Sequence, residues 1–280
     1  MSAGLLSALL KFWRLRRGMS QLDLALVANI SSRHISFLEN GRANASEEML
    51  LRVMCALEVP LRDQNHVLAA ASFPPRYLEV RLDEIDTAVD SAIQQMMRGH
   101  EPYPLTVMNA CYDIVRSNRT AENIFSQFVA QTERLNLPVN LFDLVFDPSM
   151  ARPFISNWSQ LGQQMVYRLH REALLHHKDH ELWGLLDRVL AYPDVPCAWR
   201  LPDFSITQAP INSLILKNDT LELGFFMVAT RFLDSQQITL DELRIESYFP
   251  IDHATRLACE ALADSAAQSD AVLEIITRYE

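Results

Sequence analysis

The chain has 280 residues with a formal net charge of −10, and 49% of the residues are hydrophobic. This composition is typical of a globular protein of one or two domains with a sizeable core. No run approaches the roughly 18 apolar residues of a membrane helix, so we expect a cytoplasmic protein without membrane contact. The four cysteines match no zinc or disulfide framework, and Cys55 is expected to be buried in an apolar helix.

The charge is unevenly distributed along the chain. Residues 1–75 hold eight Lys or Arg and six Asp or Glu, a net charge of +2, which leaves −12 for the remainder. A positive N-terminal part on an acidic body fits a small DNA-binding domain joined to a larger second domain.

The first elements read as short helices with defined ends. Leucines at helical spacing together with Trp13 predict a helix that stops at Gly18, a residue suited to a left-handed cap. Ser20 is a predicted N-cap of the second helix. Ala25 is small, as two closely crossing helices require, and Asn29 tolerates the positive φ of a tight turn.

A third helix follows this turn. Ser31 is its predicted N-cap, and Ile35 and Leu38 are its inward residues. The outward residues are the candidates for contact with the major groove of DNA. They are Ser32, Arg33, Ser36 and Phe37. Ser46 is a predicted cap for the next helix.

A helix opened by Pro60-Leu61 leads to Phe73-Pro74-Pro75, where prolines end helical structure. We therefore place a domain boundary here. The first domain, residues 1–75, is expected to be mainly α-helical, and the second comprises residues 76–280.

The segment from Leu5 to Ala71 resembles the Xre/Cro-type helix-turn-helix of phage repressors. The resemblance implies phosphate contacts by Gln21, Asn40 and Arg42. It implies base contacts by Ser32, Arg33 and Phe37. Of these, Arg33 is expected to select guanine, and Phe37 departs from the usual polar residue. Arg14 and Glu39 match a pair that forms an internal salt bridge in this family.

The body reads as an α+β domain. A helix is predicted at 82–97, short strands within 105–115, and a helix after Asn118. Long helices are predicted at 148–177 and 180–192, with strands at 205–206, 213–216 and 221–230 and a turn at Asn218-Asp219. This order is typical of a PAS-like domain, a sheet with helices over one face that encloses a cavity.

The whole chain resembles the MmyB-like regulators, which join an Xre-type head to a PAS-like ligand-binding body. The matching stretches are Trp13–Gln21, Ser31–Arg42, Pro60–Tyr77, Tyr112–Phe125 and Asn140–Pro148. The resemblance implies a transcription regulator, with some members holding fatty-acid-like or other apolar molecules, and it implies no enzymatic activity.

Candidate ligand contacts are the large apolar residues of the body, each of which could equally be ordinary core. They are Met108, Phe142, Phe146, Phe154, Trp158 and Phe226. Arg152 could anchor a carboxylate, or form a surface ion pair instead.

Other sites are weaker. His176 and His180 stand at i, i+4 with His170 and His177 nearby, but no third metal ligand is identifiable, so we expect no metal. The chain has no Gly-x-Ser-x-Gly, Walker A or dinucleotide-binding loop, and we expect neither catalysis nor a cofactor.

The sequence therefore predicts a regulator that binds double-stranded DNA as a homodimer and senses an apolar small molecule. Residues 255–276 read as amphipathic helices that either complete the body or form a dimer interface. The alternative is a DNA-binding adaptor whose body binds a protein partner and no small molecule.

Overall fold

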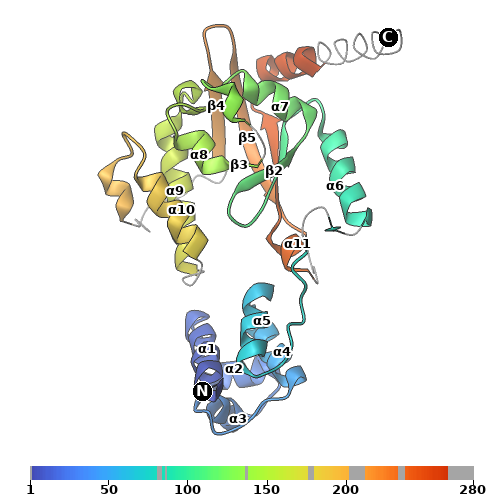
Figure 1. The fold of residues 1–280 in the computed structure, drawn as a ribbon, viewed down its shortest axis with the longest axis vertical. Helices are drawn as coiled ribbons and strands as arrows, with labels where there is room; N and C mark the ends of the chain where they lie inside the picture. Colours follow the sequence, from blue (N-terminus) through green and yellow to red (C-terminus); the bar gives the residue numbers. More distant parts are fainter. Residues whose placement is uncertain are drawn as a thin grey trace. The chain divides into compact units, whose positions relative to one another are not determined.

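The computed structural model describes residues 2–80, 84–85, 87–135, 138–175, 180–201, 212–232 and 237–263. The chain divides into two compact units (Figure 1). Unit 1 comprises Met1–Ile85 and Phe232–Asp241, and unit 2 comprises Asp86–Arg231 and Glu242–Glu280.

Unit 1 begins with five helices. They are α1 (Ser2–Arg16), α2 (Gln21–Ala28), α3 (Ser32–Glu39), α4 (Glu47–Ala56) and α5 (Leu61–Ala70). Their buried faces share one core, which is centred on Trp13, Leu24, Leu38, Leu50 and Val67. The predicted helical fold of the first domain is confirmed.

Local sequence sets the helix ends of unit 1 as predicted. Ser20 accepts a hydrogen bond from the Asp23 backbone in a capping box, and Ser31 accepts one from His34 N at 3.2 Å. Gly18 and Asn29 have φ of 64° and 51° and occupy the left-handed region.

Two features of unit 1 differ from a simple amphipathic pattern. Cys55 is exposed, so the prediction of a buried thiol was wrong, because it lies on the solvent side of α4. Helix α2 buries Leu24 and Ala25 but leaves Leu22 and Leu26 59% and 72% exposed.

The predicted boundary at residue 75 is earlier than the division of the structure, at Ile85. The segment after Pro75 stays attached to α5, since the Asn65 side chain bonds to Arg76 N and to the backbone of Tyr77. Arg62 also forms a bidentate ion pair with Glu79. These polar contacts extend unit 1 past the prolines.

Unit 2 is an α+β domain. Its helices are α6 (Thr87–His100), α7 (Arg119–Ser126), α8 (Leu141–Phe146), α9 (Trp158–Leu175) and α10 (His180–Leu190). Short turns of 3-10 helix are η2 (Thr132–Arg134), η3 (Arg152–Phe154) and η4 (Cys197–Arg200). The helix α11 (Ile238–Glu242) lies at the junction of the two sequence ranges.

The strands of unit 2 form one antiparallel sheet in the order β3-β2-β1-β6-β5-β4. They are β1 (Leu105–Met108), β2 (Asp113–Ser117), β3 (Val139–Asn140), β4 (Asn212–Lys217), β5 (Glu222–Thr230) and β6 (Arg244–Pro250). Thr106 pairs with Ser117, but Met108 pairs with Ile114, so one extra residue of β2 forms a bulge.

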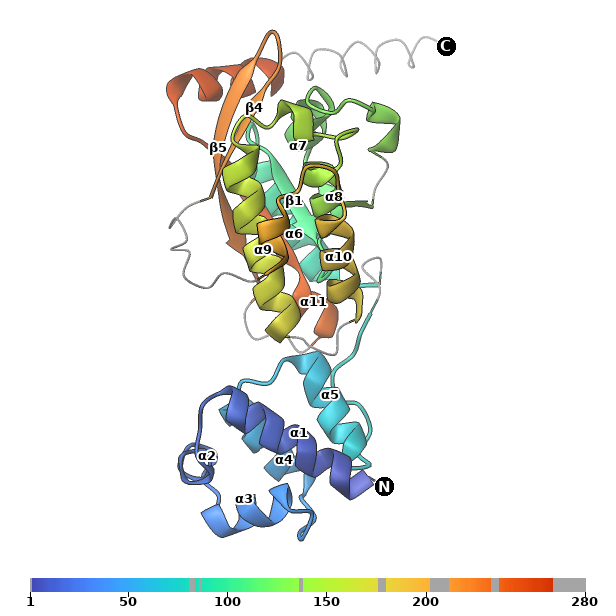
Figure 2. The same ribbon diagram turned by 90° about the vertical axis from the view of Figure 1, so that its left-hand side faces the viewer.

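Helices cover both faces of the sheet. Helices α8, α9 and α10 lie on one face and α6 on the other (Figures 1 and 2). The main core of unit 2 lies on the α8–α10 side and includes Phe142, Phe146 and Phe225. The fold is the PAS-like α+β domain expected from the sequence.

The individual elements follow the prediction in part, and β3, β6, α8 and α11 had no predicted counterpart. The strand β6 was missed, although it lies between β1 and β5 in the sheet. The predicted helix at 148–177 starts only at Trp158, because η3 precedes it. The predicted strand at 205–206 and residues 264–276 of the predicted C-terminal helices lie outside the described residues.

Candidate functional site

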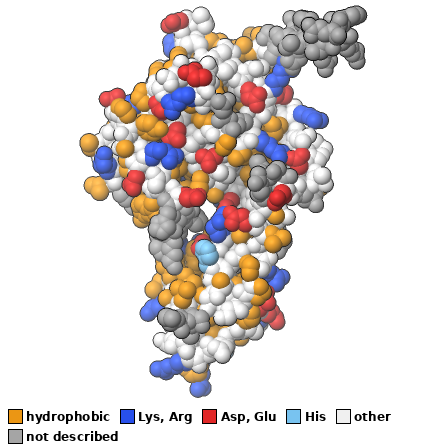
Figure 3. Space-filling model, viewed as in Figure 1, with side chains coloured by type: hydrophobic (Ala, Val, Ile, Leu, Met, Phe, Trp, Pro, Cys, Tyr) orange, Lys and Arg blue, Asp and Glu red, His pale blue; other side chains and the backbone are white. Residues whose placement is uncertain are grey.

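Helix α3 presents the residues predicted to contact bases. Ser32 and Arg33 are exposed and Phe37 is half-buried, whereas Ile35 and Leu38 are buried in the core. Basic side chains lie at the end of unit 1 that carries α3 (Figure 3). The Arg33 guanidinium stacks on the Phe37 ring, with Cζ 5.2 Å from the ring centroid. The aromatic residue therefore orients the arginine.

The three residues predicted to contact phosphate have different hydrogen-bond partners in the structure. Gln21 donates from Nε2 to Glu39 at 2.8 Å, and the second hydrogen of this amide nitrogen is the one that can be donated to a phosphate. Asn40 caps the end of α3 and donates to the Ser36 carbonyl at 2.7 Å. Arg42 is exposed in the turn that follows.

Arg14 and Glu39 connect α1 with α3. Arg14 donates to both carboxylate oxygens, at 2.6 and 2.9 Å, and the two side chains are 9% and 3% exposed. Burial alone would raise the pKa of Glu39, but hydrogen bonds from Arg14 and Gln21 hold it below its usual value. The pair has the internal position that the resemblance implied.

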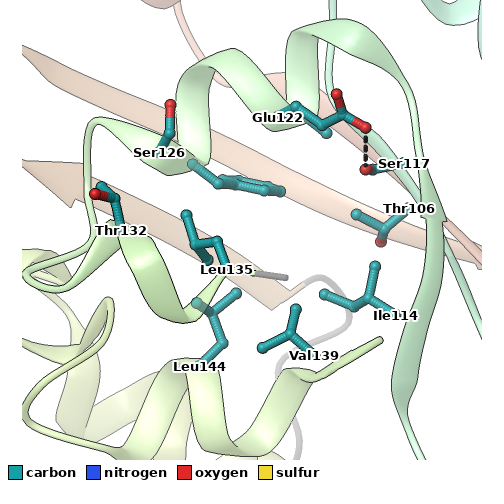
Figure 4. A pocket seen from close by; sticks show the side chains of 11 residues that line it. Thr106, Ile114, Ser117, Glu122, Ser126, Thr132, Leu135, Val139 and Leu144 are labelled. Carbon is teal, nitrogen blue, oxygen red and sulfur yellow. Dashed lines mark hydrogen bonds between the residues drawn. The ribbon is translucent and has the colours of Figure 1, made fainter. Parts of the chain in front are cut away.

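Unit 2 contains a pocket of about 380 Å³ between the sheet and α7 (Figure 4). Apolar side chains from β2, α7, β3 and α8 form much of its lining, together with Leu135. They are Ile114, Ala121, Phe125, Leu135, Val139 and Leu144. The polar lining residues are Thr106, Ser117, Glu122, Ser126 and Thr132. Volume and lining are those of a small-molecule site.

None of the seven predicted ligand residues lines this pocket. Met108, Phe142 and Phe146 are almost fully buried and fill the core instead. Phe154 packs edge-on against Phe128. Phe226 stacks on Phe249. Except for Phe226, these residues belong to the core or pack against it, as the alternative interpretation held.

Arg152 and Trp158 also have structural partners. The Arg152 guanidinium lies 4.1 Å from the Trp158 ring centroid, is 3.4 Å from the Asp194 carboxylate, and donates to the Pro193 carbonyl. Trp158 donates to the Val145 carbonyl at 2.9 Å. Arg152 thus forms the ion pair weighed as its alternative role.

A buried group of charged residues beside Tyr112 was not foreseen. Arg244 pairs with Glu172 at 2.7 Å, and the guanidiniums of Arg168 and Arg244 lie 5.0 and 4.1 Å from the Tyr112 ring centroid. Burial raises the pKa of Tyr112 to about 12. These residues come from β6, α9 and the β1–β2 turn, so no local spacing in the sequence connects them.

The histidine cluster is only partly described. His170 is buried, with Nε2 2.8 Å from the Trp199 carbonyl oxygen. His176 and His177 lie outside the described residues. No group of three metal-ligating side chains occurs among the residues that the structure describes.

Unit 1 has a small five-helix core, and its helix α3 is exposed directly after a tight turn. This arrangement is that of a helix-turn-helix DNA-binding domain, and residues 10–64 match the helix-turn-helix family model. Residues 89–262 match the model of the MmyB-like transcription regulator ligand binding domain. The chain belongs to the family of MmyB-like transcription regulators. It is a DNA-binding transcription regulator with a ligand-binding domain.

Other comparisons add little. A solved structure described as an RNA-binding light-oxygen-voltage receptor is 11% identical, with a TM-score of 0.27 over 95% of this chain and 63% of that one. The chain thus spans less than two thirds of that receptor's length, and the similarity is too low to support an argument. No curated protein matches the chain. In the described part of the chain, no helix is long and apolar enough to cross a membrane.

Proposed function

We propose that the pocket beside α7 binds an apolar small molecule and that this binding changes the affinity of the chain for operator DNA. The observation that carries the proposal is the pocket of about 380 Å³ with its lining of aliphatic and aromatic side chains. Molecules with a hydrocarbon chain, fatty-acid-like ones included, suit such a lining. The proposal assigns no reaction to the chain.

On DNA, we assign base contacts to Ser32, Arg33 and Phe37, since these residues lie on the outer side of α3. Gln21, Asn40 and Arg42 flank that helix and are assigned to phosphates. Arginine bonds bidentately to guanine O6 and N7, so Arg33 is the expected guanine reader.

A homodimer is part of the proposal. One short recognition helix contacts few base pairs, and two-fold proteins read paired half-sites about one helical turn apart. A footprint that covers one half-site only would contradict this assignment.

A large side chain substituted into the pocket tests whether the pocket binds the effector. Ser126 lines it from α7, and its exposed neighbour Gln127 does not. Native mass spectrometry of the purified chain should show a co-purified mass of a small apolar molecule. The variant Ser126→Trp should lose that mass and its effect on operator affinity, whereas Gln127→Trp should retain both.

The adaptor hypothesis makes the opposite prediction. If the body binds only a protein partner, Ser126→Trp and Gln127→Trp will have equal operator affinities with and without added apolar compounds. That result would overturn the proposed sensor function.

A further inference from the structure

The described lining of the pocket beside α7 contains a negatively charged side chain but no positively charged one. Its eleven lining residues include no lysine, arginine or histidine, and Glu122 carries the charge at the exposed rim. A ligand carboxylate or phosphate at this rim would face a like charge, and no cation is among the lining residues that the structure describes.

The serine hydroxyls of the pocket have already donated their hydrogens. Ser117 donates to Glu122 Oε1 at 3.0 Å, as Figure 4 shows. Ser126 donates to the Asn123 carbonyl at 3.0 Å. Because a hydroxyl has one hydrogen to donate, both oxygens offer only lone pairs to a ligand.

The sheet side of the pocket adds the hydroxyl of Thr106, which lies near the Tyr248 hydroxyl. Thr106 is 1% exposed and lines the pocket, and its Oγ1 has no hydrogen bond within the part of the chain that the structure describes. A buried hydroxyl without a hydrogen bond of good geometry destabilises the folded chain, and a ligand group that bonds to it recovers part of that loss.

A second carboxylate lies behind this hydroxyl. Glu246 is directly opposite Thr106 on β6 and is 4% exposed. The Tyr248 hydroxyl donates to it at 3.0 Å. Glu122 therefore places a negative charge at the rim, whereas the Glu246 carboxylate behind the floor shares its surroundings with the Arg168 guanidinium, which also acts on Tyr248.

We propose that the polar end of the ligand donates hydrogen bonds and is positively charged, so that the pocket takes a long-chain amine in preference to a fatty acid. This inference rests on the proposed function of the pocket and specifies the chemistry of its ligand. An ammonium group has three donors and no acceptor. It complements the carboxylate of Glu122 and the lone pairs of Ser117 and Ser126.

The test compares three ligands that share one hydrocarbon chain: decylamine, decanol and decanoic acid, each below its micellar concentration at about pH 7. Calorimetric titration of the full chain should give decylamine the lowest Kd, about tenfold or more below that of decanoic acid. Equal or tighter binding of decanoic acid would overturn the inference. This result would be consistent with the proposed apolar pocket. It would indicate the Arg168 guanidinium as the partner of the ligand carboxylate.

Binding of none of the three ligands would instead contradict the proposed function. The two failures are therefore distinguishable. Loss of decylamine binding in Ser126→Trp, with binding retained in Gln127→Trp, assigns the signal to this pocket.

Variants of the polar groups test the inference independently. Glu122→Gln removes the charge but keeps an acceptor for Ser117, and should weaken decylamine binding about fivefold, the size expected of an exposed ion pair. Decanol binding should be unchanged. Asp219→Asn removes the same charge from an exposed turn outside the pocket and should leave all three affinities unchanged.

Thr106→Val separates a ligand contact from a structural role. Without ligand, Thr106→Val should have a higher Tm than the unmodified chain, because the variant no longer buries a poorly bonded hydroxyl. The rise in Tm caused by decylamine should be smaller than in the unmodified chain. An unchanged ligand-induced rise would show that the ligand does not reach Thr106 and would contradict this part of the inference.

Discussion

The guanidinium of Arg33 lies over the ring of Phe37 one helical turn later, with Cζ 5.2 Å from the ring centroid. An aromatic residue among the outward positions of α3 thus has a defined partner within its own helix. The ring limits the rotamers of the arginine before DNA binds, which lowers the entropy lost on binding.

We expect Phe37→Ala to weaken operator binding about two- to fivefold, the size of an exposed cation–π contact. Arg33→Ala should cost more, about 1–3 kcal/mol, and should relax the preference at one base pair. Electrophoretic shift titrations with the operator measure both. In the Arg33→Ala background, Phe37→Ala should have almost no further effect, and fully additive losses would show that Phe37 contacts DNA by itself.

Removal of one partner of the ion pair between Arg14 and Glu39 should strongly destabilise unit 1. Arg14→Met leaves a carboxylate that is 3% exposed without its cation, which costs about 3–5 kcal/mol. Urea unfolding monitored by circular dichroism measures the loss. The double variant Arg14→Met/Glu39→Leu should be more stable than Arg14→Met alone, and a loss below about 1 kcal/mol would place the pair with ordinary surface ion pairs.

The same pair should make unit 1 sensitive to acid. Because the pKa of Glu39 is lowered in the folded state, its stabilisation is complete above the unfolded pKa, about 4.3, and is lost as the pH falls through the folded value. Urea midpoints between pH 6 and pH 3 should therefore fall more steeply for the unmodified chain than for Glu39→Gln. The exposed Glu48→Gln is the control. Parallel profiles for all three would contradict the assignment.

Alkylation should distinguish the cysteines. Cys55 and Cys197 are exposed, and Cys259 is buried. Burial and the nearby Glu260 raise the pKa of Cys259 to about 12, so it remains a thiol at pH 8. Iodoacetamide should modify Cys55 and Cys197 within minutes and Cys259 only after unfolding in urea, as read by peptide mass spectrometry. Rapid modification of Cys259 in the folded chain would contradict its buried position.

The helix ends of unit 1 were predictable because their causes are local. Ser20, Ser31 and Ser46 each precede a helix whose first free N–H groups need an acceptor, and each serine supplies it. Asn29 adopts the left-handed conformation that the turn demands. In such positions the residue type alone identifies the structure.

The strand β6 escaped prediction because its inward side chains are polar. Arg244 and Glu246 face the core side of the sheet, where Arg244 pairs with Glu172 of the distant helix α9 and Glu246 accepts from Tyr248 of the same strand. A hydrophobicity pattern treats such residues as solvent-exposed. Only the tertiary structure supplies the compensating contacts.

The pocket could not be found from its largest residues. Phe142 and Phe146 were candidates because of their size, yet they are fully buried against each other and their neighbours. The pocket is lined instead by small residues such as Ala121, Ser117 and Thr106. Space remains where side chains are short, a property that no single residue reveals in the sequence.

The bulge in β2 has a consequence for the evolution of this site. Ile114 and Ser117 are three positions apart, so a regular strand would direct them to opposite faces, yet both line the pocket. The extra residue, Val115, restores their common direction. Loss of the Val115 codon would exchange the inner and outer side chains at one end of β2 and turn a pocket-lining side chain away, although no lining residue would be replaced. Related regulators that share this pocket should therefore tolerate substitution in β2 far better than a change in its length.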